Sequence, residues 1–132
     1  HSADAALEKK PQAVKVVLVD FHAEATSEKV AMGWYLDGQV SAVVGTHTHV
    51  PTADERVLPA GTAHISDVGM TGCYNSILGM EIAGVLKRFV QRVPERFEAA
   101  TGPVWICGVV IDVDEQTGAS RGIKRVRVNE TD

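Results

Sequence analysis

The sequence predicts a single α/β domain over residues 1–132, in which a parallel strand–helix–strand unit precedes a mostly antiparallel β tail. Two apolar runs, at 14–20 and 40–44, are typical of strands that lie inside a sheet. The segment between them has helical spacing, and the chain after Pro51 alternates short β-rich runs with glycine turns. No repeat, low-complexity stretch or linker composition divides the chain, so one domain accounts for all of it.

The strand–helix–strand unit follows from local signals. The run at 14–20 is β-branched and nearly all apolar, so we expect a strand that is covered on both faces. A helix is expected over 26–36, where capping residues precede apolar side chains three and four apart, and Gly38 suits its C-terminal end. The strand at 40–44 follows, and such a crossover implies parallel pairing. Both strands therefore deliver their C-terminal loops to the same edge of the sheet.

The remainder is predicted to be mainly β structure, and it opens with a hairpin. A glycine-punctuated loop is expected at 68–72, and helical spacing with basic residues near its end predicts a helix over 80–90. The expected strands cover residues 55–58, 62–67, 96–99, 104–114 and 122–128. At the other end, the chain starts without a methionine, and residues 2–10 resemble the tail of a helix already under way, so we expect a missing upstream portion.

Composition excludes some partners and leaves others open. The formal charge is −4, and the most basic segment, 121–127, has the alternation of a strand with one solvated side, which we prefer to a phosphate-binding patch. There is thus no strong signal for nucleic-acid binding. No apolar run approaches the roughly 18 residues of a membrane span and no secretory signal is visible, so a cytoplasmic protein is the default expectation. Cys107 is most simply a core residue, whereas Cys73 lies in a turn-like segment and could be exposed.

Histidines mark the sheet edge at which the two strands end. His47 and His49 follow the second strand in the sequence GTHTHVP, and His22 follows the first. Imidazole nitrogens are good ligands for zinc, manganese and iron, and an extended backbone at 47–49 would point both imidazoles to one side. These three histidines are the candidate metal ligands, although each alone could be a hydrogen-bonded strand-end residue. His64, which alternates with apolar neighbours, is expected to be structural.

Each carboxylate near these histidines has two possible roles. Asp20 and Glu24 flank His22, and either could accept the second ring proton of a ligating histidine. Asp20 could equally be a turn residue and Glu24 a charge at the helix entry. Thr48 is a third candidate for a residue that contacts a metal ligand and not the metal ion itself. Asp67 is most simply a turn former. No obvious bridging carboxylate for a two-metal site is present in the chain.

Long motifs in this sequence resemble the YmdB-like branch of the calcineurin-like metallophosphoesterases, and the resemblance runs from about residue 14 to the end. The segments that carry it are DFHAEATSEK (20–29), MGWYLDG (32–38), GTHTHV (45–50), TADER (52–56) and TAHISDVGMTG (62–72). The resemblance implies part of a metallophosphoesterase sandwich and a phosphodiesterase that uses a metal-activated hydroxide, with 2′,3′-cyclic nucleotides as the substrate class. It also implies a cytoplasmic protein that self-associates.

The family pattern assigns roles to the histidines. It places His22 and His47 on one metal ion and His49 on the other, with iron or manganese as the ions. Members of the family also carry a Gly-Asp strand end, a bridging Glu, Asn ligands and a proton-donating His, and none of those motifs occurs here. The chain therefore resembles the carboxyl-terminal half of the domain, without a catalytic residue of its own. Alone it is expected to bind metal weakly and to have little or no activity, and its missing amino-terminal half is the expected partner.

Two other functions fit the residues. One is a noncatalytic assembly or interaction module, in which the β tail makes the contacts and the histidines are structural. The other is a mononuclear zinc hydrolase, in which His22, His47 and His49 are three ligands and the fourth position is open. Metal content and the dependence of activity on zinc distinguish these functions from the two-metal phosphodiesterase.

Overall fold

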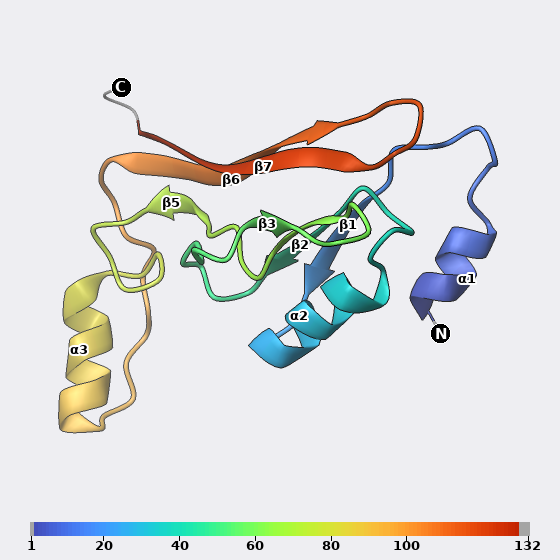
Figure 1. The fold of residues 1–132 in the computed structure, drawn as a ribbon. Coiled ribbons are helices and arrows are strands. Elements are labelled where there is room, and N and C mark those ends of the chain that lie inside the picture. Colours follow the sequence, from blue (N-terminus) through green and yellow to red (C-terminus); the bar gives the residue numbers. More distant parts are fainter. Residues whose placement is uncertain (1, 130–132) are drawn as a thin grey trace.

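The computed structural model of the chain describes residues 2–129, which form two β-sheets and three helices (Figure 1). The elements are, in chain order, α1 (Ser2–Glu8), β1 (Leu18–His22), α2 (Thr26–Tyr35), β2 (Ala42–Thr46), β3 (Arg56–Val57), β4 (Ala63–Ile65), β5 (Thr71–Cys73), α3 (Ile82–Gln91), β6 (Val104–Val113) and β7 (Ser120–Asn129). The predicted α/β class and its antiparallel tail are confirmed. The helix expected at the start of the chain is α1.

The first sheet has the strand order β1-β2-β4-β3. β1 and β2 pair in parallel, with α2 as the crossover between them, as the sequence predicts. β2 is buried from Ala42 to Gly45, whereas Leu18 in β1 is 61% exposed. The expectation that the first strand is covered on both faces is therefore wrong within residues 2–129, because alternate residues of β1, beginning with Leu18, are exposed. Among these residues β1 is also an edge strand of the sheet. It also begins late, at Leu18, since its partner strand starts only at Ala42.

The hairpin predicted after the first unit is formed by β3 and β4, which pair antiparallel. Leu58 and Thr62 close its turn with a backbone hydrogen bond of 2.8 Å, and Gly61 adopts a φ of 100° that suits glycine. β4 also pairs in parallel with β2, which the sequence does not predict. That pairing places the loop after β4 beside the loop after β2.

The second sheet has the order β5-β6-β7 and is antiparallel throughout. The long β6–β7 hairpin runs along the first sheet in Figure 1, and Ser120 at the start of β7 donates to the Ser41 carbonyl over 2.7 Å. The loop expected at 68–72 is partly wrong, because its end forms β5. The strand expected at 96–99 is also wrong: this segment runs beside α3 and the turn before it, so only one bridge forms, between Met80 and Ala99.

Apolar packing is concentrated between the first sheet and the helices α1 and α2. Leu36, Val40 and Val43 form the buried cluster, against which side chains of α1, β1 and α2 pack. In contrast α3 projects from the sheets in Figure 1 and buries only Val85.

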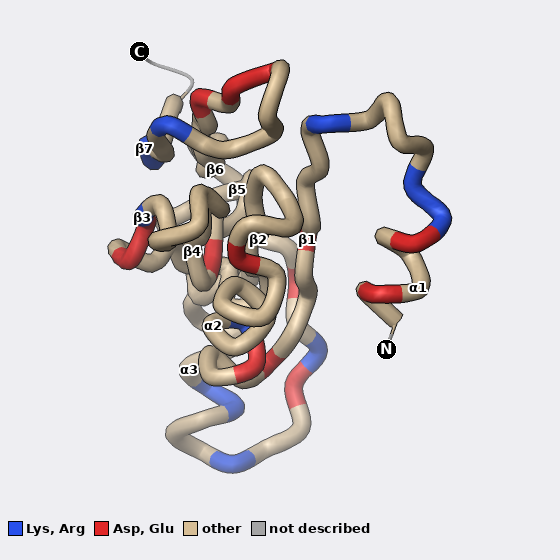
Figure 2. Tube along the Cα trace, turned by 45° about the vertical axis from the view of Figure 1, so that its right-hand side comes forward, with Lys and Arg blue, Asp and Glu red and all other residues tan. Residues whose placement is uncertain are grey.

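Charges are distributed over several segments. Figure 2 shows lysines and arginines on α3, on β7 and between α1 and β1, with acidic residues in other parts of the chain. The basic segment at 121–127 lies in β7, as the solvated-strand interpretation requires. Arg125 pairs with Glu55 over 2.7 Å, and Arg127 lies 3.7 Å over the Trp105 ring. Within residues 2–129, no helix is long and apolar enough to cross a membrane.

Candidate functional site

The loops after β1 and β2 meet at one sheet edge, as predicted. His22 is the last residue of β1 and lies in register with Thr46, the last residue of β2. His22 Nε2 lies 3.2 Å from His47 Nδ1, and the two rings meet edge to face with centroids 5.1 Å apart. The parallel pairing of the strands thus brings together two of the three candidate ligands.

The backbone at 47–49 is not extended, so the expectation that both imidazoles point to one side is wrong. The φ angles of His47 and His49 are 152° and 63°, which non-glycine residues rarely adopt. His47 faces His22, whereas His49 turns toward the Leu78 carbonyl oxygen, 3.0 Å from its Nδ1. Among residues 2–129, no group of three or more His, Cys, Asp or Glu side chains is arranged to hold one metal ion. A mononuclear site with three histidine ligands is therefore not formed.

A hydrogen-bond chain fixes the orientation of His22. The Thr46 hydroxyl lies 3.4 Å from Asp20 Oδ1 and 3.1 Å from His22 Nδ1. An ionised carboxylate can only accept, so the Thr46 hydroxyl donates to Asp20 and accepts from the Nδ1–H of His22. The Nε2 of His22 then carries its lone pair toward His47. Asp20 thus acts on the histidine through Thr46, and not by direct contact with the ring.

The His22–His47 pair fits a metal ion. Two nitrogens that bind one ion at 2.0–2.1 Å with tetrahedral angles lie about 3.3 Å apart. The observed separation of 3.2 Å between His22 Nε2 and His47 Nδ1 is close to that value. Without an ion, a proton on His47 Nδ1 can be donated to His22 Nε2 at the same distance. The geometry thus suits two ligands of one ion with little movement of either ring.

Asp67 makes the hydrogen bond to the amide two residues on that is typical of a turn former, and it also anchors the loop that carries His47 and His49. The sequence does not predict this second role. The Asp67 carboxylate accepts from the Thr48 amide over 2.8 Å, the Gly69 amide over 2.9 Å and the Lys29 ammonium over 3.2 Å. Asp67 and Lys29 are 0% and 1% exposed. Burial raises the pKa of the Asp67 carboxyl, but the hydrogen bonds from Thr48, Gly69 and Lys29 outweigh it and hold the pKa below its usual range.

A sequence signal for this anchor exists on the helix. Lys29 lies four and seven residues before Gly33 and Leu36, which are buried residues of the same helical face. A lysine on a buried face requires an acidic partner, because an unpaired buried charge is costly. The partner itself cannot be read from the sequence, since Asp67 lies 38 residues further along the chain.

The other candidates behind the ligands differ from one another. Thr48 contributes its amide to Asp67, while its hydroxyl donates to the Val50 carbonyl over 2.8 Å. Glu24 is exposed, and its side chain makes no hydrogen bond or ion pair within the described part of the chain, 2–129. Glu24 lies two residues before the start of α2, so its position is that of a charge at the helix entry.

His64 and the cysteines lie apart from this edge. His64 is buried, with Nδ1 3.2 Å from the Val43 carbonyl oxygen, as its structural role predicts. Burial lowers its pKa, although the charge of Asp54 acts in the opposite direction. Cys73 is buried, contrary to the expectation that it could be exposed, and Cys107 is half-buried.

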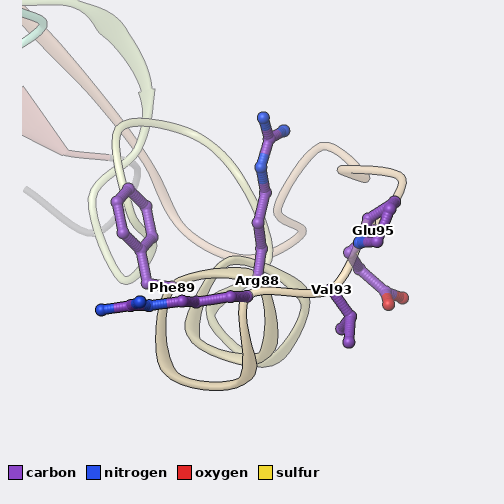
Figure 3. A pocket seen from close by; sticks show the side chains of 6 residues that line it. Arg88, Phe89, Val93 and Glu95 are labelled. Atoms are coloured by element: carbon purple, nitrogen blue, oxygen red, sulfur yellow. The ribbon is translucent and has the colours of Figure 1, made fainter.

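The cavity at the end of α3 does not coincide with the candidate metal ligands. It has a volume of about 580 Å³, and Arg88, Phe89, Val93 and Glu95 line it (Figure 3). None of the candidate metal ligands lines it. The site is recognised by the side chains at the sheet edge, most of which are exposed.

The chain is an α/β protein in which a mainly parallel sheet, with histidines at the ends of two strands, lies next to an antiparallel sheet. Residues 1–126 match the family of YmdB-like proteins, and the chain belongs to this family. It is similar to a 2′,3′-cyclic-nucleotide 2′-phosphodiesterase of Bacillus subtilis, with 53% identity over 128 residues that make up 97% of this chain and 48% of that protein.

Solved structures agree with the fold. A hypothetical protein from Thermus thermophilus is 44% identical with a TM-score of 0.88, and the match covers 98% of this chain and 50% of that one. A phosphatase of Mycoplasma pneumoniae is 36% identical with a TM-score of 0.87, covering 97% and 45%. The chain thus spans about half the length of the relatives it matches.

Proposed function

We propose that this chain contributes the histidine ligands of a two-metal phosphodiesterase that hydrolyses 2′,3′-cyclic nucleotides. The single observation that carries the proposal is the 3.2 Å approach of His22 Nε2 and His47 Nδ1 at the edge of the parallel sheet. The substrate class is supported by the name of the Bacillus subtilis relative.

Each histidine has a distinct task in this proposal. His22 and His47 bind one ion with the facing nitrogens, and His49 binds a second ion with Nε2, since its Nδ1 contacts the Leu78 carbonyl. Iron and manganese are the proposed ions, because imidazole nitrogens suit both. Such ions lower the pKa of bound water and stabilise negative charge on a phosphoryl group. The residues of this chain hold and orient the ligands, through Asp20 and Thr46 behind His22 and through Asp67 behind Thr48.

The proposal requires a further half of the domain as partner. The amino-terminal half of the family domain would supply the bridging carboxylate and the proton donor. Among residues 2–129 no strand pairs with the outer edge of β1, and Leu18 in β1 and Val16 just before it are 61% and 48% exposed. This edge offers backbone groups and apolar surface on which that half can pack. On this basis, the chain alone binds metal weakly and has no measurable turnover.

Self-association and a cytoplasmic location belong to the same proposal. Four apolar side chains of α3 are exposed and could be covered by a second copy of the protein: Ile82, Leu86, Phe89 and Val90. The two cysteines, Cys73 and Cys107, are both free, which suits a reducing compartment.

Phosphodiester hydrolysis tests the proposal. A chromogenic phosphodiester and a 2′,3′-cyclic nucleotide would be supplied with manganese to this chain together with the other half of a family domain. We expect hydrolysis that is lost in His47→Ala and retained in Asp112→Asn, an exposed carboxylate on β6. Equal hydrolysis by the His47→Ala variant, or none in any mixture that binds manganese, would exclude the proposed function and favour an assembly module.

A further inference from the structure

Left-handed backbone conformations gather around the candidate site. Within residues 2–129, four non-glycine residues have a positive φ, and three of them are His47, His49 and Leu78. The fourth, Arg92, ends α3. Such conformations are unfavourable for residues with a side chain and persist where surrounding contacts hold them, often at functional sites. Leu78 is the one among the three with no candidate role.

Leu78 and Gly79 form the tight turn between Ile77 and Met80. The φ angles of Leu78 and Gly79 are 54° and 92°, and Ile77 and Met80 exchange two backbone hydrogen bonds of 3.0 Å. Two consecutive positive φ angles define a type I′ turn, whose first central position favours Asn or Gly. A leucine there is exceptional, and it is 50% exposed, so its side chain gains little from packing.

The carbonyl of Leu78 makes the contact that explains the turn. Its oxygen lies 3.0 Å from His49 Nδ1. A carbonyl can only accept, so the proton of the neutral imidazole resides on Nδ1, and Nε2 keeps its lone pair. The backbone of His49 is held by the same segment, because the Tyr74 hydroxyl lies 3.3 Å from the His49 carbonyl oxygen.

The turn itself is anchored by Ser76. The Ser76 hydroxyl accepts from the Gly79 amide over 2.8 Å and donates to the Cys73 carbonyl. Cys73 belongs to β5 and is buried, so the turn is connected to the second sheet. The carbonyl of Leu78 is therefore presented from a structured support.

We propose that Leu78 is a positioning residue for His49: the left-handed backbone at Leu78 aims its carbonyl at His49 Nδ1 and so fixes the tautomer that leaves Nε2 able to bind a metal ion. The metal part of this inference rests on the proposed function. The tautomer part concerns the chain itself and can be measured without a metal.

Two substitutions of similar size separate the backbone effect from loss of the side chain. Leu78→Asn introduces a residue that tolerates positive φ, whereas Leu78→Val introduces a β-branched residue that does not. The imidazole nitrogens of the metal-free chain would be observed by long-range ¹⁵N–¹H NMR at mildly alkaline pH. We expect His49 to carry its proton on Nδ1 in the original chain and in Leu78→Asn, and to shift toward the Nε2–H form in Leu78→Val.

Manganese then reports the consequence for metal binding. The Leu78→Val variant should need about 10-fold more Mn²⁺ than Leu78→Asn to broaden the His49 ring signals equally, as is typical when a partner behind a ligand is lost. If Leu78→Val does not fold, Gly79→Ala replaces it: its Cβ would have 3.7 Å to the nearest atom, Met70 Sδ, so only the positive φ opposes it.

The outcomes are distinct for the two proposals. An unchanged His49 tautomer in the disfavoured variant overturns the role of Leu78, whatever manganese does. A shifted tautomer supports the role of Leu78. If the histidine signals of the same chain do not respond to manganese, the histidines are not metal ligands and the proposed function is contradicted.

Discussion

Replacing Lys29 with methionine is the most informative perturbation of the loop anchor. The ammonium lies 3.2 Å from Asp67 Oδ2, and both side chains are almost completely buried. Removing one partner of such a pair costs about 3–5 kcal/mol, because the other charge stays buried. Asp67 retains the amide hydrogen bonds from Thr48 and Gly69, so we expect Lys29→Met to lower the free energy of unfolding by about 3 kcal/mol.

The expected loss can be converted to a melting temperature. An unfolding entropy of about 2.1 cal/mol/K per residue gives about 0.28 kcal/mol/K for a chain of 132 residues. A loss of about 3 kcal/mol then lowers the midpoint by roughly 11 °C. Urea and thermal denaturation followed by circular dichroism measure both quantities. Lys87→Met is the matched control, since its pair with Glu95 is half exposed and worth less than about 1 kcal/mol.

The pair also gives stability a dependence on pH. The pKa of Asp67 is lower in the folded chain than its ordinary value, so the folded state favours the charged carboxylate. This contribution is present above about pH 4 and is lost as pH falls through the folded-state pKa. Lys29→Met removes one cause of the low pKa, and acidification should therefore destabilise it less than the original chain. A Lys29→Met chain within about 1 kcal/mol of the original at neutral pH would refute the anchoring role.

Two further predictions concern the C-terminal end of β2. Gly45→Ala should prevent folding, because its Cβ would clash with the Ser66 carbonyl oxygen. Gly108→Ala is its control, since a Cβ there would meet no atom within 4 Å. Equal melting curves for the two variants would contradict the packing. Thr46→Val removes the hydroxyl behind His22 while keeping its shape, and manganese affinity should fall about 10-fold in a calorimetric titration. An unchanged affinity would show that the Asp20 chain does not orient this ligand.

Local patterns in the sequence predict most of the elements that carry the site. The apolar run that contains β2 and the helical spacing of α2 are local, and both elements appear close to their expected ends. The expected side-chain cap of α2 is wrong, because its N-cap residue is Ala25 and no side chain caps the helix. The start of the first strand is less well predicted. The sequence at 14–17 is typical of a strand, but pairing with the neighbouring strand begins only where Val17 meets Ser41 and Leu18 meets Ala42. Pairing with a neighbour, and not composition, decides where β1 begins.

The geometry of the site depends on contacts between residues that are distant in the sequence, and the periodicity of the sequence does not predict such contacts. The alternation of His47 and His49 suggests an extended backbone, yet Asp67 bonds the Thr48 amide and the Leu78 carbonyl accepts from His49. Both partners are distant in sequence, and together they stabilise positive φ angles that local propensity disfavours. The residue types could therefore be predicted, but not the directions in which their nitrogens point.

Crystals of the chain together with the other half of a family domain, soaked in manganese, would give an anomalous difference map that locates the ions. One peak is expected between His22 Nε2 and His47 Nδ1, and a second peak next to His49 Nε2. No peak at the sheet edge, or one ion bound by all three histidines, would contradict the assignment of ligands to a two-metal site.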